Sequence, residues 1–143
     1  MKILKYVLVF GMVLSTLLAC DNQSEQRDQY NTLFAEVIAI HDELMPQMTA
    51  ISNIQSQLKA TDSVALSVPK QELLEQANTA DSVMMTWMHS FTDTYVKDRV
   101  PVAEMSPEQL KTAVNGLQEE LQEIKELRDL TQNCIAKSKE LLK

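Results

Sequence analysis

The amino-acid sequence predicts an all-α protein, an antiparallel up-down-up bundle of three long helices. The chain has only two glycines in 143 residues, and glycine is among the residues that most often interrupt regular elements. It has few of the alternating β-branched stretches that are typical of strands. Its apolar residues instead recur three and four positions apart over long stretches, which is the periodicity of amphipathic helices.

The N-terminus has the pattern of a secretory signal. Lys2 and Lys5 form a short positive region, and residues 6–19 are apolar except for a glycine, a serine and a threonine. This stretch is too short for a comfortable membrane span. It ends in Leu17-Leu18-Ala19-Cys20, which resembles the lipobox of bacterial lipoproteins. The resemblance implies cleavage before Cys20 and acylation of that cysteine. The alternative is an ordinary cleaved signal followed by an incidental cysteine.

Three regions follow from this pattern: a lipoprotein signal peptide at 1–19, a lipidated cysteine with a polar tether at 20–29, and a helical bundle at 30–143. Removal of residues 1–19 leaves 124 residues with eleven basic and twenty acidic side chains, a net charge of −9. So acidic a domain is unsuited to nucleic acid, whose phosphates require a basic surface. We therefore expect a protein of the bacterial envelope that the lipid anchors to a membrane and that faces the periplasm or the cell surface.

The first helix is predicted to begin at Tyr30, with residues 21–29 either a flexible tether or its frayed start. Its apolar stripe alternates steps of four and three residues. The stripe comprises Tyr30, Phe34, Val37, His41, Leu44, Met48, Ile51, Gln55 and Leu58. Pro46 falls inside this helix and removes a backbone hydrogen bond to Asp42. It predicts a bend at 42–46, either a kink that follows the curvature of the bundle or a functional break.

Residues 61–68 form a connection, and Pro69 lies in the first turn of a second helix that runs to about Tyr95. Its apolar face comprises Leu73, Ala77, Met84, Met88 and Phe91. Residues 96–105 contain a proline and are expected to form an extended connector. An open hairpin that completes its core with a second copy is the alternative to the closed bundle.

Ser106-Pro107-Glu108-Gln109 predicts the start of the third helix through a serine cap, a first-turn proline and a capping glutamine. The apolar stripe of this helix comprises Leu110, Val114, Leu117, Leu121, Ile124, Leu127, Thr131 and Cys134. The helix has no evident internal stop, although Gly116 costs it roughly 1 kcal/mol relative to alanine. With Cys20 acylated, Cys134 is the only thiol. We expect it to be a small buried hydrophobe, with an intermolecular disulfide as the alternative.

Histidine and methionine gather in two short windows, one in each of the first two helices. The seven residues are His41, Met45, Met48, Met84, Met85, Met88 and His89. A helical hairpin places His41 opposite Met88 and Met45 opposite Met84. Thioether and imidazole groups side by side are the ligands that Cu(I) or Ag(I) selects, and Trp87 lies in the same window. We expect these methionines to fill an irregular core with no cofactor present, and a Cu(I) or Ag(I) site is the alternative.

The same windows carry a resemblance. The segments His41-Asp42-Glu43-Leu44-Met45-Pro46 and Met84-Met85-Thr86-Trp87-Met88-His89-Ser90-Phe91 form the patterns HDExMP and MMxWMxxF. They resemble a group of small uncharacterised lipoproteins of Bacteroidota-type bacteria, some of which are labelled "viral A-type inclusion protein". The resemblance covers roughly residues 30–95. It implies a helical lipoprotein and supplies no activity and no functional residues.

Enzymatic chemistry finds little support in the sequence, because there is no glycine-rich phosphate loop and no nucleophile spaced from a base. Four glutamates of the third helix are expected to form a solvated face: Glu119, Glu120, Glu123 and Glu126. We therefore expect a non-enzymatic binding or adaptor module whose partner is an envelope protein or another copy of the chain. The alternative function is binding of Cu(I) or Ag(I).

Overall fold

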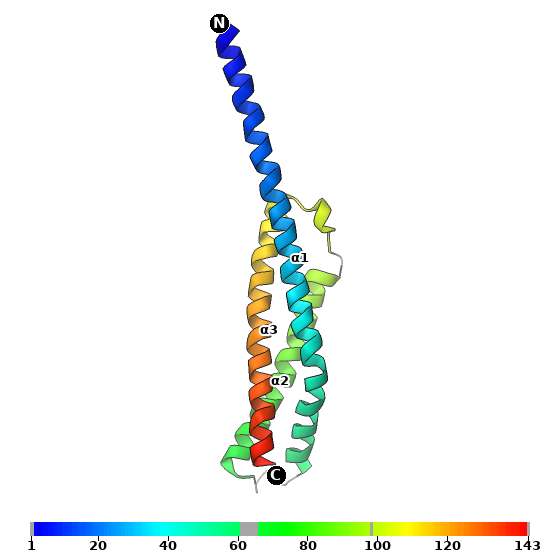
Figure 1. Cartoon of the computed structure of the whole chain (residues 1–143). Coiled ribbons are helices and arrows are strands. Elements are labelled where there is room, and N and C mark those ends of the chain that lie inside the picture. Colours follow the sequence, from blue (N-terminus) through cyan, green and yellow to red (C-terminus); the bar gives the residue numbers. More distant parts are fainter. Residues whose placement is uncertain (1, 61–65, 98, 143) are drawn as a thin grey trace.

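Figure 1 shows the computed structural model, which describes residues 2–60, 66–97 and 99–142, with side chains from residue 23 onward. Its elements are α1 (Lys2–Ala60), α2 (Val68–Phe91), the π-helical turn η2 (Thr92–Val96), the 3-10 turn η3 (Val102–Glu104) and α3 (Pro107–Leu141). Every regular element of this part of the chain is helical, and the three α-helices pack against one another. The all-α class and the three-helix packing are thereby confirmed. Within the described residues, no helix combines the length and apolarity that a membrane crossing requires.

Helix α1 is 59 residues long and continues without interruption through the polar stretch at 20–29 and through Pro46. The side chains of residues 2–22, which include the signal segment and Cys20, lie outside the described residues, as do residues 61–65 of the first connection. Arg27 is half-buried, and its Nη2 donates to the carbonyl oxygen of Ala103 at 3.2 Å. The end of the polar stretch is thus tied to the connector that follows α2. The expected bend at Pro46 stays a prediction.

Contacts between the helices fix their relative register. Along α1 the contacts with α2 come in reverse order, from Phe34 on Phe91, through His41 on Trp87, to Gln55 Nε2 donating to the Ala77 carbonyl at 3.3 Å.

The contacts of α1 with α3 come in the same order along both helices. Lys125 Nζ donates to Glu36 Oε1 at 2.9 Å, and Gln132 Nε2 donates to Glu43 Oε1 at 3.5 Å. Both pairs are 89 residues apart, so α1 and α3 keep one register over two turns.

The buried core has two parts. The aromatic core comprises Tyr30, Val37, Ile40, Leu44, Met84, Trp87, Phe91, Tyr95, Leu110, Val114, Leu117, Ile124 and Leu127. The aliphatic core comprises Ile51, Ile54, Leu58, Leu66, Leu73, Ala77, Ala80 and Cys134. The predicted stripe of the third helix is confirmed, with only Leu121 half-buried. The first stripe missed Ile40 and Ile54, because α1 packs against two helices and buries a wider face than one stripe.

Five aromatic side chains form an aromatic ladder across α1 and the end of α2. Its members are Tyr30, Phe34, Trp87, Phe91 and Tyr95. In the pairs of rings that contact each other, the ring centroids are 4.9 to 6.1 Å apart. Members on one helix are four residues apart and therefore share a face. The ladder fills the aromatic core from the level of Trp87 to the level of Tyr95.

The predicted start of the third helix is confirmed in detail. The Ser106 side chain accepts from the Gln109 backbone N–H at 3.2 Å, and the Gln109 side chain accepts from the Ser106 N–H at 2.9 Å. Pro107 occupies the first turn, where its missing N–H is not needed. Helix α2 ends differently, because the backbone passes into the π turn η2, closed by the Lys97 N–H donating to the Thr92 carbonyl at 2.8 Å.

Gly116 has a packing reason that the sequence did not reveal. A Cβ at this position would collide with the phenol oxygen of Tyr95. The hydroxyl end of Tyr95 therefore lies directly against the backbone of α3. Glycine at this position makes room for the hydroxyl end of Tyr95.

We expect Gly116→Ala to lower the free energy of unfolding by about 1–2 kcal/mol, although alanine is the better helix former. In a Tyr95→Phe background the new methyl group meets only the ring carbon Cζ at 3.5 Å. There the same substitution should raise the free energy of unfolding by up to about 1 kcal/mol. Denaturant unfolding of the four proteins measures the change of sign, and an equal effect in both backgrounds would contradict this packing.

Candidate functional site

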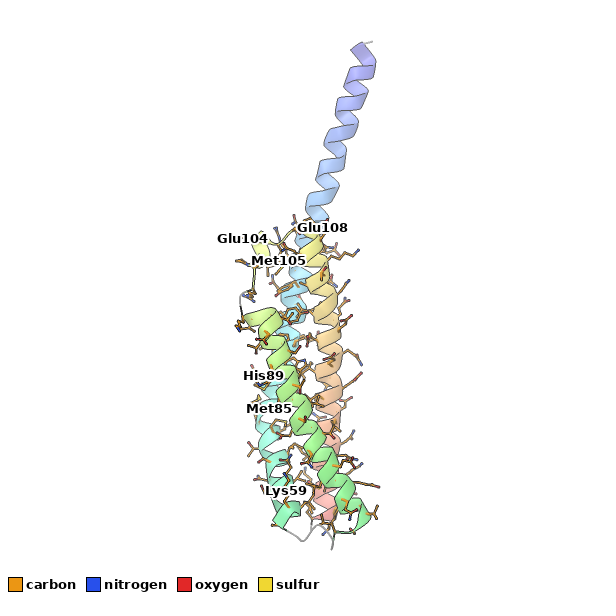
Figure 2. All side chains as sticks on the ribbon, turned by 180° about the vertical axis from the view of Figure 1, so that it is seen from behind. Lys59, Met85, His89, Glu104, Met105 and Glu108 are labelled. Atoms are coloured by element: carbon orange, nitrogen blue, oxygen red, sulfur yellow. The ribbon has the colours of Figure 1, made fainter. Side chains whose placement is uncertain are left out.

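An open groove lies at the end of the bundle where the N-terminal part of α1 leaves it. Its volume is about 600 Å³. Figure 2 shows Met105 and Glu108 at this end, beside Glu104 of η3. The groove is lined by Tyr30, Thr94, Tyr95, Arg99, Val100, Met105, Glu108, Gln109, Thr112, Ala113 and Gly116. Helix α1, the π turn η2, the connector that follows it and helix α3 therefore contribute to the groove.

The local sequence explains why the bundle stays open here. The π turn η2 places Tyr95 in the core while the chain leaves α2, and π turns of this kind are frequent at functional sites. Ala113 and Gly116 offer little side chain on the α3 wall. The floor of the groove is therefore aromatic, and its α3 side carries small residues at these two positions.

The groove has charged side chains at its rim. Arg99 is exposed, and its guanidinium carbon lies 5.5 Å from the ring centroid of Phe34. This cation–π contact holds the cation beside the groove without neutralising it. Glu108 is the acidic group that also lines the groove. The groove thus combines an apolar floor with one cation and one anion at its edge.

Burial, and then the charges of Glu120, Tyr30 and Glu119, raise the pKa of Tyr95 to about 12. The phenol is consequently neutral at physiological pH and acts there as a hydrogen-bonding group and as packing surface. It is not a base at pH 7.

Glu120 does not belong to the solvated face of α3, so the prediction for this residue is wrong. Its Oε2 is buried, as is the indole Nε1 of Trp87, and neither atom has a hydrogen bond of ordinary geometry. Burial raises the pKa of the Glu120 carboxyl, Glu123 adds to the rise, and the nearby Trp87 indole opposes it. Glu119, Glu123 and Glu126 are exposed as expected. Glu120 is half-buried because the aromatic core covers one more position around α3 than the apolar stripe predicts.

The histidine and methionine windows divide by burial. Met84 is 2% exposed in the aromatic core, while Met48 and Met88 are half-buried against it. Met45 is 40% exposed and Met85 51%. Met85 and His89 are both exposed and lie one turn apart on α2 (Figure 2).

His41 is half-buried at the edge of the aromatic core. Its ring lies 5.8 Å from that of Trp87, and its Nδ1 is 3.1 Å from Asp42 Oδ1. Within the described residues, no group of three His, Cys, Asp or Glu side chains could hold a metal ion. Any metal at this seam would therefore need thioether ligands.

Cys134 is fully buried in the aliphatic core, which confirms its prediction as a buried hydrophobe. Burial raises the pKa of its thiol, and Lys137 lowers it by less. The protonated, buried thiol is a poor nucleophile.

Comparison of the chain with family models, with curated proteins and with solved structures gave no match.

We expect Glu120→Gln to raise the free energy of unfolding by about 1 kcal/mol at pH 7, because it removes a charge from a half-buried carboxyl group whose desolvation disfavours the charged form. The advantage should shrink as the pH falls, since the raised pKa lets the folded wild type take up a proton before the unfolded chain does. Denaturant unfolding between pH 4 and pH 7 measures this trend. Glu72→Gln, at an exposed position of α2, is the control. A difference that does not vary with pH would contradict the assignment.

Proposed function

We propose that this protein is a lipid-anchored lipoprotein of the bacterial envelope whose helical domain is a non-enzymatic binding module. In this proposal residues 1–19 are removed, Cys20 carries the lipid, and the remaining chain forms an up-down-up bundle that faces the periplasm or the cell surface. The positive n-region, the apolar stretch and the Leu17-Leu18-Ala19-Cys20 segment support the anchor. The groove supports the binding role.

The position of the groove carries the proposal. Tyr30, which lines the groove, follows Cys20 by ten residues in the continuous helix α1. Ten helical residues span about 15 Å. An anchored domain would thus hold the groove close to the membrane surface, where envelope partners assemble. A stiff helix would keep the groove at that height.

The chemistry of the groove indicates the kind of partner. Its aromatic and aliphatic lining suits an apolar side chain or a short apolar segment of a protein. The exposed guanidinium of Arg99 suits an acidic residue that flanks such a segment. We therefore propose a protein partner in the envelope, which includes a second copy of this chain. The net charge of −9 after processing disfavours nucleic acid.

Cys20→Ser tests the anchor. We expect the variant to lose incorporation of a palmitate analogue and to keep residues 1–19, because the proposed site of both acylation and cleavage is gone. Cys134→Ala is the control, since that thiol is buried in the core. A Cys20→Ser variant that still takes up the label, or still loses residues 1–19, would argue against a lipoprotein.

A photo-crosslinking residue at Thr112, which lines the groove and is exposed, tests the binding role in intact cells. We expect a discrete crosslinked product from this position and none from Asn133, an exposed position at the other end of α3. Arg99→Glu should reduce the product severalfold by reversing the charge at the rim. A product of twice the mass of the processed chain identifies a second copy. Equal amounts of crosslinked product from both positions would contradict the proposal that the groove is the binding site.

A further inference from the structure

The seam between α1 and α2 carries soft donor groups that the groove does not use. His41 and Met45 are one turn apart on α1 and share a face, and Met85 and Met88 are neighbours on α2. We call these four residues the thioether seam.

Two contacts on either side of the seam set its register. The His41 ring stacks on Trp87, and further along α1 Gln55 Nε2 donates to Asn78 Oδ1 at 3.1 Å. Between these contacts the residues of the two helices meet in opposite order, which brings Met45 level with Met85.

The same contacts show which flanks face each other. Met45 follows His41 by one turn on the face that meets α2, and Met85 follows Asn78 by two turns on the flank that reaches α1. Met88 is half-buried against the aromatic core, and the register places it level with His41. The four residues therefore lie within one stretch of the two facing helices.

Packing does not explain the two outer methionines. A methionine stabilises a core by burying its flexible apolar chain, which accounts for Met84, at 2% exposed, and for Met48. Met45 and Met85 are 40% and 51% exposed. Two exposed thioethers at one level of two facing helices contribute little to burial, and their sulfur atoms are open to a ligand.

His41 is oriented as a metal-binding histidine usually is. Its Nδ1 lies 3.1 Å from the Asp42 carboxylate, and its ring stacks on Trp87. A carboxylate on one ring nitrogen fixes the ring and leaves the other nitrogen, here Nε2, to ligate. The Asp42 charge also offsets a bound cation.

We infer that the thioether seam binds one monovalent soft metal ion, Cu(I) or Ag(I), through the sulfur atoms of Met45, Met85 and Met88 and Nε2 of His41. Neutral thioethers favour soft monovalent ions, whereas zinc requires thiolate, imidazole or carboxylate ligands. The described residues supply no group of three such side chains. Met48 and Met84 belong to the core beneath the site. His89 is exposed one turn beyond Met85, further from the level of Met45, and is not part of the inferred ligand set.

Titration of the full-length chain in detergent with Ag(I) tests the inference, with Cys20→Ser as the background so that its thiol does not compete. Cu(I) is titrated anaerobically against a chromophoric chelator. We expect one ion per chain and quenching of Trp87, the only tryptophan. Met45→Leu combined with Met85→Leu should weaken binding by at least about tenfold. Both positions are exposed, so leucine leaves the core intact, and circular dichroism and thermal unfolding check the fold.

Met105→Leu is the matched control, because Met105 is the one methionine after residue 20 that lies outside the two windows. It should bind like the background protein. Absence of binding by the background protein, or equal binding by the double variant, would overturn the inference. Loss of binding in Cys134→Ala would also overturn it, since the thiol would then be the ligand. The groove and the anchor are tested separately, so failure here leaves the proposed function standing.

Discussion

The aromatic ladder is the interaction on which the rest of the structure depends. After residue 20 the chain has only five aromatic residues, and all five belong to the ladder. Each stacked or tilted pair adds about 0.5–1.5 kcal/mol beyond the burial of its area. One end of the ladder, at Tyr30 and Tyr95, forms the floor of the groove. The other end, at Trp87, holds the ring of His41 at the thioether seam. Both candidate sites therefore rest on one packed unit.

The ladder also explains why the two halves of the bundle differ. The aliphatic core has Ala77 and Ala80 on α2, both fully buried, and such small residues let helices approach closely. Large rings in the aromatic core need space on α3, which Gly116 provides for Tyr95. The aromatic half also reaches Glu120 and buries one of its oxygens. Where the ladder ends at Tyr30 and Tyr95, the small residues Ala113 and Gly116 line the groove on the α3 side.

The sequence predicted what depends on local rules. The stripe of α3 and the capping box at Ser106 follow from spacing and from side chains within one turn, and both are found. The sequence did not predict the groove, because its floor depends on a π turn and on the approach of Tyr95 to Gly116 across two helices. The one signal was Gly116 itself, a costly residue inside a long helix. The number of residues between the two helices predicted that His41 lies opposite Met88, and the observed ring contact is with the adjacent residue, Trp87. The same count could not predict that Met84 is buried and Met85 exposed, because burial depends on how far each helix is rotated about its axis.

Helix α1 sets the heights of the two sites above an anchored Cys20. The groove residue Tyr30 would stand about 15 Å from Cys20 along the axis and His41 about 30 Å, at 1.5 Å per residue. The tie from Arg27 to the Ala103 carbonyl fixes the connector to the same helix, so the rim of the groove does not move independently of the anchor. A lipid at Cys20 would keep the groove within reach of the headgroup region and leave the seam in the aqueous phase. Under the proposed anchor, a partner in the groove would have to lie at the membrane surface, whereas a metal ion would reach the seam from solution.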